Sequence, residues 1–352
     1  MAGASLSHPG REDYGPQALS TFSSLTILGL ASSKGGMIPV TLSRSASFPA
    51  HRSTAYELPS NERQGWESLP VPLNKPHLEL ELGDCLGDGR IGLVYGARIS
   101  RVLDRPGGVQ IHSPAFNSAV ELCIKIAKPT RCRSLARELW FYERLSEDKG
   151  YQGEVVPRCY GLFTTPLNAI TASQGRNVRI DPWPDKYMHA PLDDSDSETD
   201  EDEDHLADDE EGTAFLADDR PFKTDSPWNT WRYSPDSPLI SLLVTEKLGE
   251  VYSKEAFKSN PSSRNDLANL IEDLSSAAVL HNDFKFNNVV RALPGSPPCS
   301  RHGYAHEWRV IDFDRASRWG KTVKRDDDLF IRHARKKWAK GWGWFWGIPD
   351  DL

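Results

Sequence analysis

The chain has 352 residues, 38% of them hydrophobic and 10% aromatic, which is enough for the core of one large domain or two small ones. It has five cysteines, an odd number, and no C-x-x-C pair. We therefore expect reduced thiols in an intracellular protein, cytoplasmic or nuclear, and neither a disulfide framework nor a zinc site. No apolar run approaches the ~18 residues of a transmembrane helix, so we expect no membrane span.

The formal net charge of −8 is dominated by one segment. Residues 193–211 hold 13 carboxylates and no Lys or Arg, so the rest of the chain carries −8 + 13 = +5. Such a run of like charges stays solvated. Overall acidity therefore says little about the folded part. We do not expect nucleic acid as a partner, because the basic and aromatic residues over 332–346 are expected to pack on the fold.

Residues 1–75 are rich in Ser, Pro and Gly and show no sustained hydrophobic period, which predicts a disordered or loosely attached arm. Within it, residues 44–49 read R-S-A-S-F-P. This pattern is typical of 14-3-3 binding once Ser47 is phosphorylated, because an Arg cluster grips the phosphate. A chance match in a Ser-rich arm is the alternative.

Ordered structure is expected from Leu78, where L-E-L-E-L alternation predicts a half-buried strand. The strand runs into G-x-G-x-x-G-x-V, formed by Gly87, Gly89, Gly92 and Val94. A dinucleotide fingerprint would need these glycines to open a helix. Residues 94–99 instead indicate a second strand, so the pattern favours a glycine-rich hairpin whose backbone N–H groups approach phosphates.

Two further elements carry candidate polar residues. Residues 120–126 predict a strand with Lys125 in apolar surroundings, although a surface lysine would fit too. Residues 134–145 predict a helix with Glu138 on its apolar stripe, so we expect Glu138 to pair with Lys125 rather than remain solvated. Another strand is predicted over 155–163.

The middle of the chain departs from this regular pattern. Residues 165–237 are rich in Pro and Asn and then acidic, and we interpret them as a mostly disordered insertion. A buried strand resumes over 239–249. The stretch 264–280 predicts a helix begun by a capping pair, Ser263 and Asp266.

The helix leads into a stretch that suits phosphoryl transfer. Asp283, Lys285 and Asn288 follow one another closely before an apolar run, and Asp312 ends the next short apolar strand. Such chemistry needs a carboxylate for the nucleophile's proton, a cation for the moving phosphoryl group, and oxygen ligands for a metal ion.

This ordered set resembles the protein-kinase-like superfamily. The resemblance implies an α+β, two-lobed fold, with an antiparallel-sheet N-lobe over 76–250 and a reduced, mainly helical C-lobe over 251–352. It also implies ATP and Mg²⁺ as ligands. Catalytic roles would fall to Asp283, Lys285, Lys125 and Glu138, and Mg²⁺ would bind Asn288 and Asp312. ATP would contact the glycine hairpin (Gly87, Gly89, Gly92, Val94), Lys125, and an adenine pocket formed by Cys123, Thr245, Glu246 and Leu248.

Departures from the family pattern leave three hypotheses open. Asn282 precedes the catalytic Asp where an Arg is usual, and Asp314 stands where protein kinases have Gly, as in phosphotransferases of the aminoglycoside and choline type. Few residues follow Asp314, and they include a basic and aromatic segment over 332–346 that we expect to pack on the shortened lobe. A Ser/Thr protein-kinase-like enzyme is the first hypothesis. A small-molecule kinase and a pseudokinase that serves as a binding module are the others.

Overall fold

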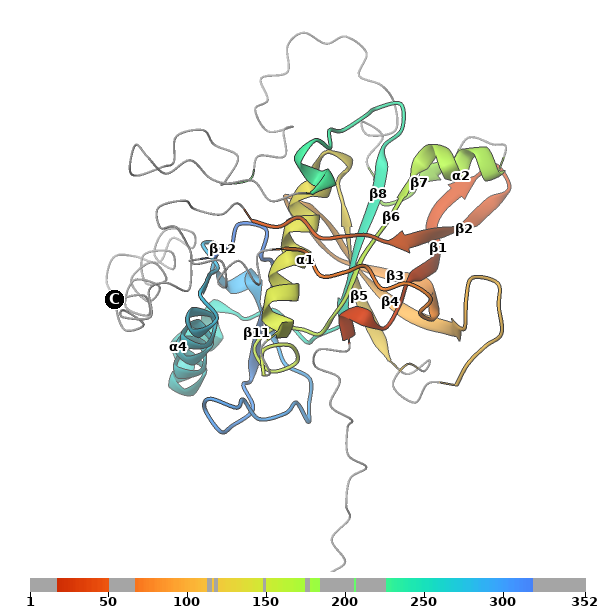
Figure 1. Ribbon diagram of the computed structural model, residues 1–352. Helices are drawn as coiled ribbons and strands as arrows, with labels where there is room; N and C mark the ends of the chain where they lie inside the picture. The colour runs from red at the N-terminus through yellow and green to blue at the C-terminus, as the bar shows by residue number, and fades with distance from the viewer. Residues whose placement is uncertain are drawn as a thin grey trace, which may run out of the picture.

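The computed structural model describes residues 18–50, 67–112, 116, 120–147, 150–174, 178–183, 206 and 226–318. Its central feature is a closed barrel in which the strands follow the order β2-β6-β8-β5-β4-β3-β1, and β1 pairs with β2 to close the ring (Figure 1). The pair β1–β3 is parallel. The other pairs of the ring are antiparallel. The seven strands are β1 (Ser24–Ser33), β2 (Gly36–Arg44), β3 (His77–Asp88), β4 (Gly92–Leu103), β5 (Glu121–Ala127), β6 (Cys159–Pro166) and β8 (Leu239–Glu246).

The barrel shows that the predicted two-lobed, protein-kinase-like fold, and the family resemblance with it, are wrong. The sheet is closed and mixed where an antiparallel sheet was expected. The described residues contain four α-helices in place of a mainly helical second lobe, namely α1 (Cys132–Glu147), α2 (Leu167–Gln174), α3 (Lys254–Ser259) and α4 (Pro261–Ser276). Closure leaves no unpaired edge in the ring, which removes the risk of edge-to-edge aggregation.

The two strands that close the ring come from the segment predicted to be a loose arm. For residues 18–50 that prediction is wrong, because β1 and β2 direct buried side chains into the barrel. Leu25, Ile27, Val40 and Leu42 are each fully buried there. The Ser and Gly content of these strands concealed the period-2 pattern of a half-buried strand.

The inner and outer faces of the barrel pack against different cores. Leu122, Ile124 and Ile126 of β5 fill the interior, while Cys123 and Lys125 alternate outward and are half-buried. Helix α1 packs on β6 and β8 and lies between the barrel and α4 (Figure 1). Lys125 on the outward face of β5 reaches Glu138 of α1, so this face is only partly covered by the helix.

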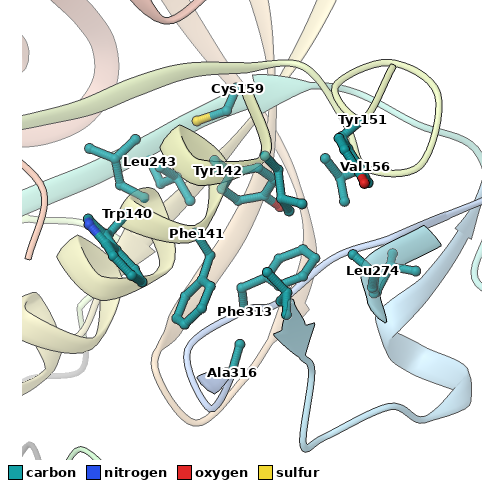
Figure 2. Packing of buried hydrophobic residues seen from close by; sticks show 14 of the residues in the cluster. Trp140, Phe141, Tyr142, Tyr151, Val156, Cys159, Leu243, Leu274, Phe313 and Ala316 are labelled. Atoms are coloured by element: carbon teal, nitrogen blue, oxygen red, sulfur yellow. The ribbon is translucent and has the colours of Figure 1, made fainter. Parts of the chain in front are cut away.

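Behind α1 lie short strands that hold the C-terminal loops. Strand β10 (Val289–Arg291) pairs with β11 (Trp308–Val310), and β9 (Val279–Leu280) pairs with β12 (Ser317–Arg318). Figure 2 shows Phe313 pointing toward Phe141 and Tyr142 of α1, with ring centroids 6.4 and 5.4 Å away. This aromatic packing fixes the loop after β11 against the helix.

Helix α4 begins differently from the prediction. Asn260 caps it by accepting hydrogen bonds from the backbone N–H groups of Ser262 and Ser263. The expected capping pair of Ser263 and Asp266 is therefore wrong, since Asp266 accepts from the backbone N–H of Glu307 instead.

Parts of the predicted insertion belong to the folded structure. Residues 167–174 form α2, and β7 (Arg179–Ile180) pairs with β1 outside the ring. Trp183 is buried and its Nε1 donates to the carbonyl of Ala127 at 3.0 Å. The disordered assignment is wrong for these stretches. The acidic run 193–211, except Leu206, and the basic and aromatic segment after 318 lie outside the described residues.

Ser47 is fully buried, and its Oγ donates to Glu143 Oε2 at 2.6 Å. A 14-3-3 protein needs an accessible phosphoserine in an extended segment, so the folded protein does not present the expected motif. Within the described part of the chain, no helix combines the length and hydropathy needed to cross a membrane.

Candidate functional site

The first cluster of the candidate site surrounds Lys125 on the outer face of β5. Its Nζ lies 2.6 Å from Glu138 Oε2 and 2.5 Å from Asp312 Oδ1. The helical stripe that predicted Glu138 as the partner of Lys125 thus places it correctly in space. Burial alone would lower the pKa of Lys125, but the carboxylates of Asp312 and Glu138 outweigh burial and raise it, so the amine stays charged.

The second cluster is formed by the three polar residues that follow β9. Lys285 Nζ lies 2.9 Å from Asp283 Oδ2. Asn288 Nδ2 donates to the backbone carbonyl of Asp283 at 2.8 Å and to its Oδ2 at 3.2 Å. The other oxygen, Asp283 Oδ1, is buried and accepts no hydrogen bond from the described residues.

Backbone contacts bring the two clusters together. The N–H of Ile311 donates to the carbonyl of Asn288 at 3.0 Å. His281 Nε2 lies 2.8 Å from the carbonyl of Ile311, and its Nδ1 accepts from the N–H of Asp283 at 3.3 Å, which assigns the proton to Nε2. Burial lowers the pKa of His281, so the ring is a neutral brace between the loops. This role of His281 was not predicted from the sequence.

Two residues of these loops adopt left-handed backbone conformations. Asn282 has a φ of 58° and Asp312 a φ of 70°. Each such residue costs on the order of 1–3 kcal/mol and tends to occur where function requires a specific orientation. The Asn282 side chain offsets part of this cost by donating to the carbonyl of Arg315 at 3.0 Å.

Two carboxylates lie close together at the end of β11. Burial and the charge of Asp312 raise the pKa of Asp314 to about 6. Burial would also raise the pKa of Asp312, but the adjacent Lys125 holds it at about 2. Arg90, from the glycine turn, forms an ion pair with Asp314 and so connects that turn to the cluster. Sequence reasoning missed this pair because 224 residues separate its members.

The glycine pattern forms the expected hairpin between β3 and β4, where the N–H of Gly89 donates to the carbonyl of Gly92. A Cβ at Gly92 would lie 2.1 Å from the carbonyl oxygen of Ile126, so strand packing requires this glycine. A Cβ at Gly87 would meet nothing within 4 Å. Val94 is the register partner of both Gly87 and Lys125, which places the hairpin beside the first cluster.

The residues expected around adenine are only partly available. Cys123 and Thr245 are register partners on the half-buried outer face, and burial raises the pKa of Cys123 to about 11. Glu246, whose backbone was expected to bond the adenine edge, is buried, and its N–H is already used to donate to the carbonyl of Arg158. Leu248 is half-buried after the end of β8.

Neither protein-family models nor curated proteins yield a match to this chain. The geometry of the two clusters is therefore the evidence that bears on function.

Proposed function

We propose that the protein is an ATP-dependent phosphotransferase that moves the γ-phosphoryl group of ATP to a hydroxyl, with Asp283 as the base. The observation that supports this most is the orientation of Asp283. Lys285 and Asn288 both contact Oδ2, while Oδ1 is buried without a hydrogen-bond partner among the described residues. A buried acceptor without a partner costs about 1–3 kcal/mol, and a substrate hydroxyl would satisfy it.

The other side chains supply positive charge at fixed positions. Phosphoryl transfer depends mainly on positioning and on charge stabilisation. Lys285 would offset charge on the transferred group, while Lys125, held by Glu138, would contact the α- and β-phosphates. Gly87 and Gly89 leave the hairpin backbone open to phosphate oxygens, since a Cβ at either would meet nothing closer than 3.5 Å.

The side-chain oxygen atoms of Asn288 and Asp312 are suitable ligands for Mg²⁺. Asn288 uses its Nδ2 to bind Asp283, which leaves its amide oxygen available as a ligand. Together with the carboxylate of Asp312, it offers the hard oxygen atoms that Mg²⁺ prefers, and one or two protein ligands suffice. Bound Mg²⁺ would neutralise charge on the phosphates and orient them.

A Ser or Thr hydroxyl of a protein is the acceptor that we propose first, and a small-molecule hydroxyl is the alternative. The full chain should be incubated with γ-labelled ATP and Mg²⁺, with a peptide array and a metabolite library as acceptors. Label on peptides supports the first acceptor class, and label on a metabolite supports the second.

The matched variants for this assay are Asp283→Asn and Asp236→Asn. Loss of a general base costs about 10²–10⁴-fold in rate, so Asp283→Asn should lose transfer by that factor while still binding MgATP in a thermal-shift assay. Asp236 is exposed and should tolerate the same change. A wild-type chain that binds MgATP without turnover would contradict the proposal and favour a binding module.

A further inference from the structure

A second group of polar residues lies away from the proposed phosphoryl-transfer site, where the loop between β10 and β11 contacts α4. Ligand atoms of Asp273, Cys299, His302 and His306 all lie within 4.8 Å of one another. Asp273, Cys299 and His306 are buried, and His302 is half-buried. The loop residues have the spacing C-x-x-H-x-x-x-H, which is typical of zinc ligands, while Asp273 comes from the helix.

We propose that Asp273, Cys299, His302 and His306 bind a structural Zn²⁺ ion. Zinc takes four ligands in tetrahedral geometry from sulfur, imidazole nitrogen and carboxylate oxygen, and a structural site leaves no open position. The carboxylate and the thiolate would balance both charges of the ion. The proposal does not depend on the phosphotransferase function.

The distances suit this assignment. Asp273 Oδ2 lies 2.9 Å from His306 Nε2 and 3.4 Å from Cys299 Sγ. Zinc–ligand bonds of ~2.0–2.3 Å at tetrahedral angles put neighbouring ligand atoms ~3.3–3.6 Å apart, so the Asp273–His306 pair needs to open by only a few tenths of an ångström and the Asp273–Cys299 pair already fits. His302 Nε2 is 3.0 Å from Asp273 Oδ1, yet it is buried and makes no hydrogen bond of good geometry within the described residues.

The surrounding residues orient the proposed ligands. His306 Nδ1 lies 2.5 Å from Asp266 Oδ1, an arrangement in which the carboxylate accepts the ring N–H and leaves Nε2 free to bind metal. Asp266 is itself fixed by the hydroxyl of Tyr304 and the N–H of Glu307. Arg301 Nε contacts Asp273 Oδ1 at 2.5 Å, which leaves Oδ2 for the ion. A carboxylate that orients a histidine in this way is common at zinc sites.

The ion would have a structural consequence for the loops on either side. It would tie the segment Cys299–His306 to α4, and this segment leads directly into β11. A chelator should therefore lower the melting temperature of the full chain, and Zn²⁺ should restore it. An unchanged melting temperature after complete chelation would contradict a structural site.

Metal content gives the direct test. The full chain should be stripped with EDTA, equilibrated with Zn²⁺, passed through a desalting column and analysed by mass spectrometry of the metal. We expect about one equivalent of zinc per chain. The Co²⁺-loaded chain should show the intense visible bands of tetrahedral cobalt and a thiolate-to-cobalt charge-transfer band. Less than stoichiometric zinc, or an octahedral cobalt spectrum, would overturn the proposal.

Variants distinguish this site from adventitious binding. Cys299→Ser should remove the charge-transfer band, and His302→Ala, at the most exposed ligand, should weaken zinc binding without disturbing the core. Asp266→Asn should weaken it by about 10–100-fold through the orientation of His306. Cys85→Ser and His112→Ala change the same residue types at exposed positions and should bind zinc like wild type. Equal zinc affinity in all five variants would show that the group is only a hydrogen-bonded cluster.

Discussion

Strand packing and the proposed phosphate binding can be tested separately in the glycine hairpin. Gly92 and Gly87 belong to one motif but have different surroundings. A Cβ at Gly92 would lie 2.1 Å from the Ile126 carbonyl oxygen, whereas ordinary contact begins at 3.4 Å. The shortfall of 1.3 Å (3.4 − 2.1) forces β4 and β5 apart at a paired position. A Cβ at Gly87 meets no atom within 4 Å.

The expected stability changes follow from this geometry. Overpacking of this size costs about 3 kcal/mol, and a folded domain of about 150–250 residues loses about 2–4 °C of Tm per kcal/mol. Gly92→Ala should therefore lower the Tm by about 6–12 °C. Gly87→Ala should stay within about 0.5 kcal/mol of wild type. Gly96→Ala in the same strand is the control, since its Cβ would make only ordinary contacts of 3.8–4.0 Å.

The affinity for MgATP tests the proposed phosphate-binding role of the hairpin. If the N–H groups of the turn bind phosphates, the Cβ of a Gly87→Ala variant would occupy the open space through which a phosphate approaches. The variant should then lose one hydrogen bond to a charged group, worth about 1.5–3 kcal/mol. This corresponds to an MgATP affinity at least about tenfold weaker in calorimetry. A Gly92→Ala variant that melts like wild type would refute the packing argument, and unchanged affinity in Gly87→Ala would refute phosphate binding at the turn.

Three other perturbations test individual contacts. Lys125→Met should leave the buried Glu138 and the half-buried Asp312 without their cation, lowering the free energy of unfolding by about 3–5 kcal/mol in urea and abolishing transfer; an unchanged midpoint would contradict the ion pairs. Alkylation followed by mass spectrometry should modify the exposed Cys85 at neutral pH, while Cys123, whose pKa burial raises to about 11, should react only as the pH approaches that value; equal rates would contradict its burial. Ser47→Asp should place a second charge against Glu143 and destabilise the fold by several kcal/mol, whereas a variant as stable as wild type would show that Ser47 is accessible.

Local patterns predicted single elements better than their assembly. The alternation at Leu78 and the apolar run at Leu239 both mark strands of the barrel, and helical spacing placed Glu138 opposite Lys125. Each of these features lies within a short window, where period alone separates buried from exposed positions. Barrel closure required β1 to pair with β3 about 50 residues later, which no local pattern encodes.

In the candidate site, too, contacts between residues close in sequence were predictable and contacts between distant segments were not. Asp283, Lys285 and Asn288 are close in sequence, and their mutual contacts could be anticipated from spacing. The contact between Arg90 and Asp314 could not be predicted, because it depends on how the glycine hairpin lies against the loop that follows β11. No zinc site was expected from the sequence because only C-x-x-C pairs were considered, although Cys299, His302 and His306 form a local C-x-x-H-x-x-x-H motif. Asp273 lies 26 positions before Cys299 and outside this motif, so only the fold shows that it joins the group.

The most direct test of the proposed mechanism is a single-turnover measurement of γ-phosphoryl transfer from bound ATP in the wild-type and Asp283→Asn chains. At saturating MgATP, the variant should bind nucleotide as wild type does and transfer the label about 10²–10⁴-fold more slowly. Equal rates in the two chains would show that the unpartnered oxygen of Asp283 takes no proton in the reaction, and the proposed mechanism would fail.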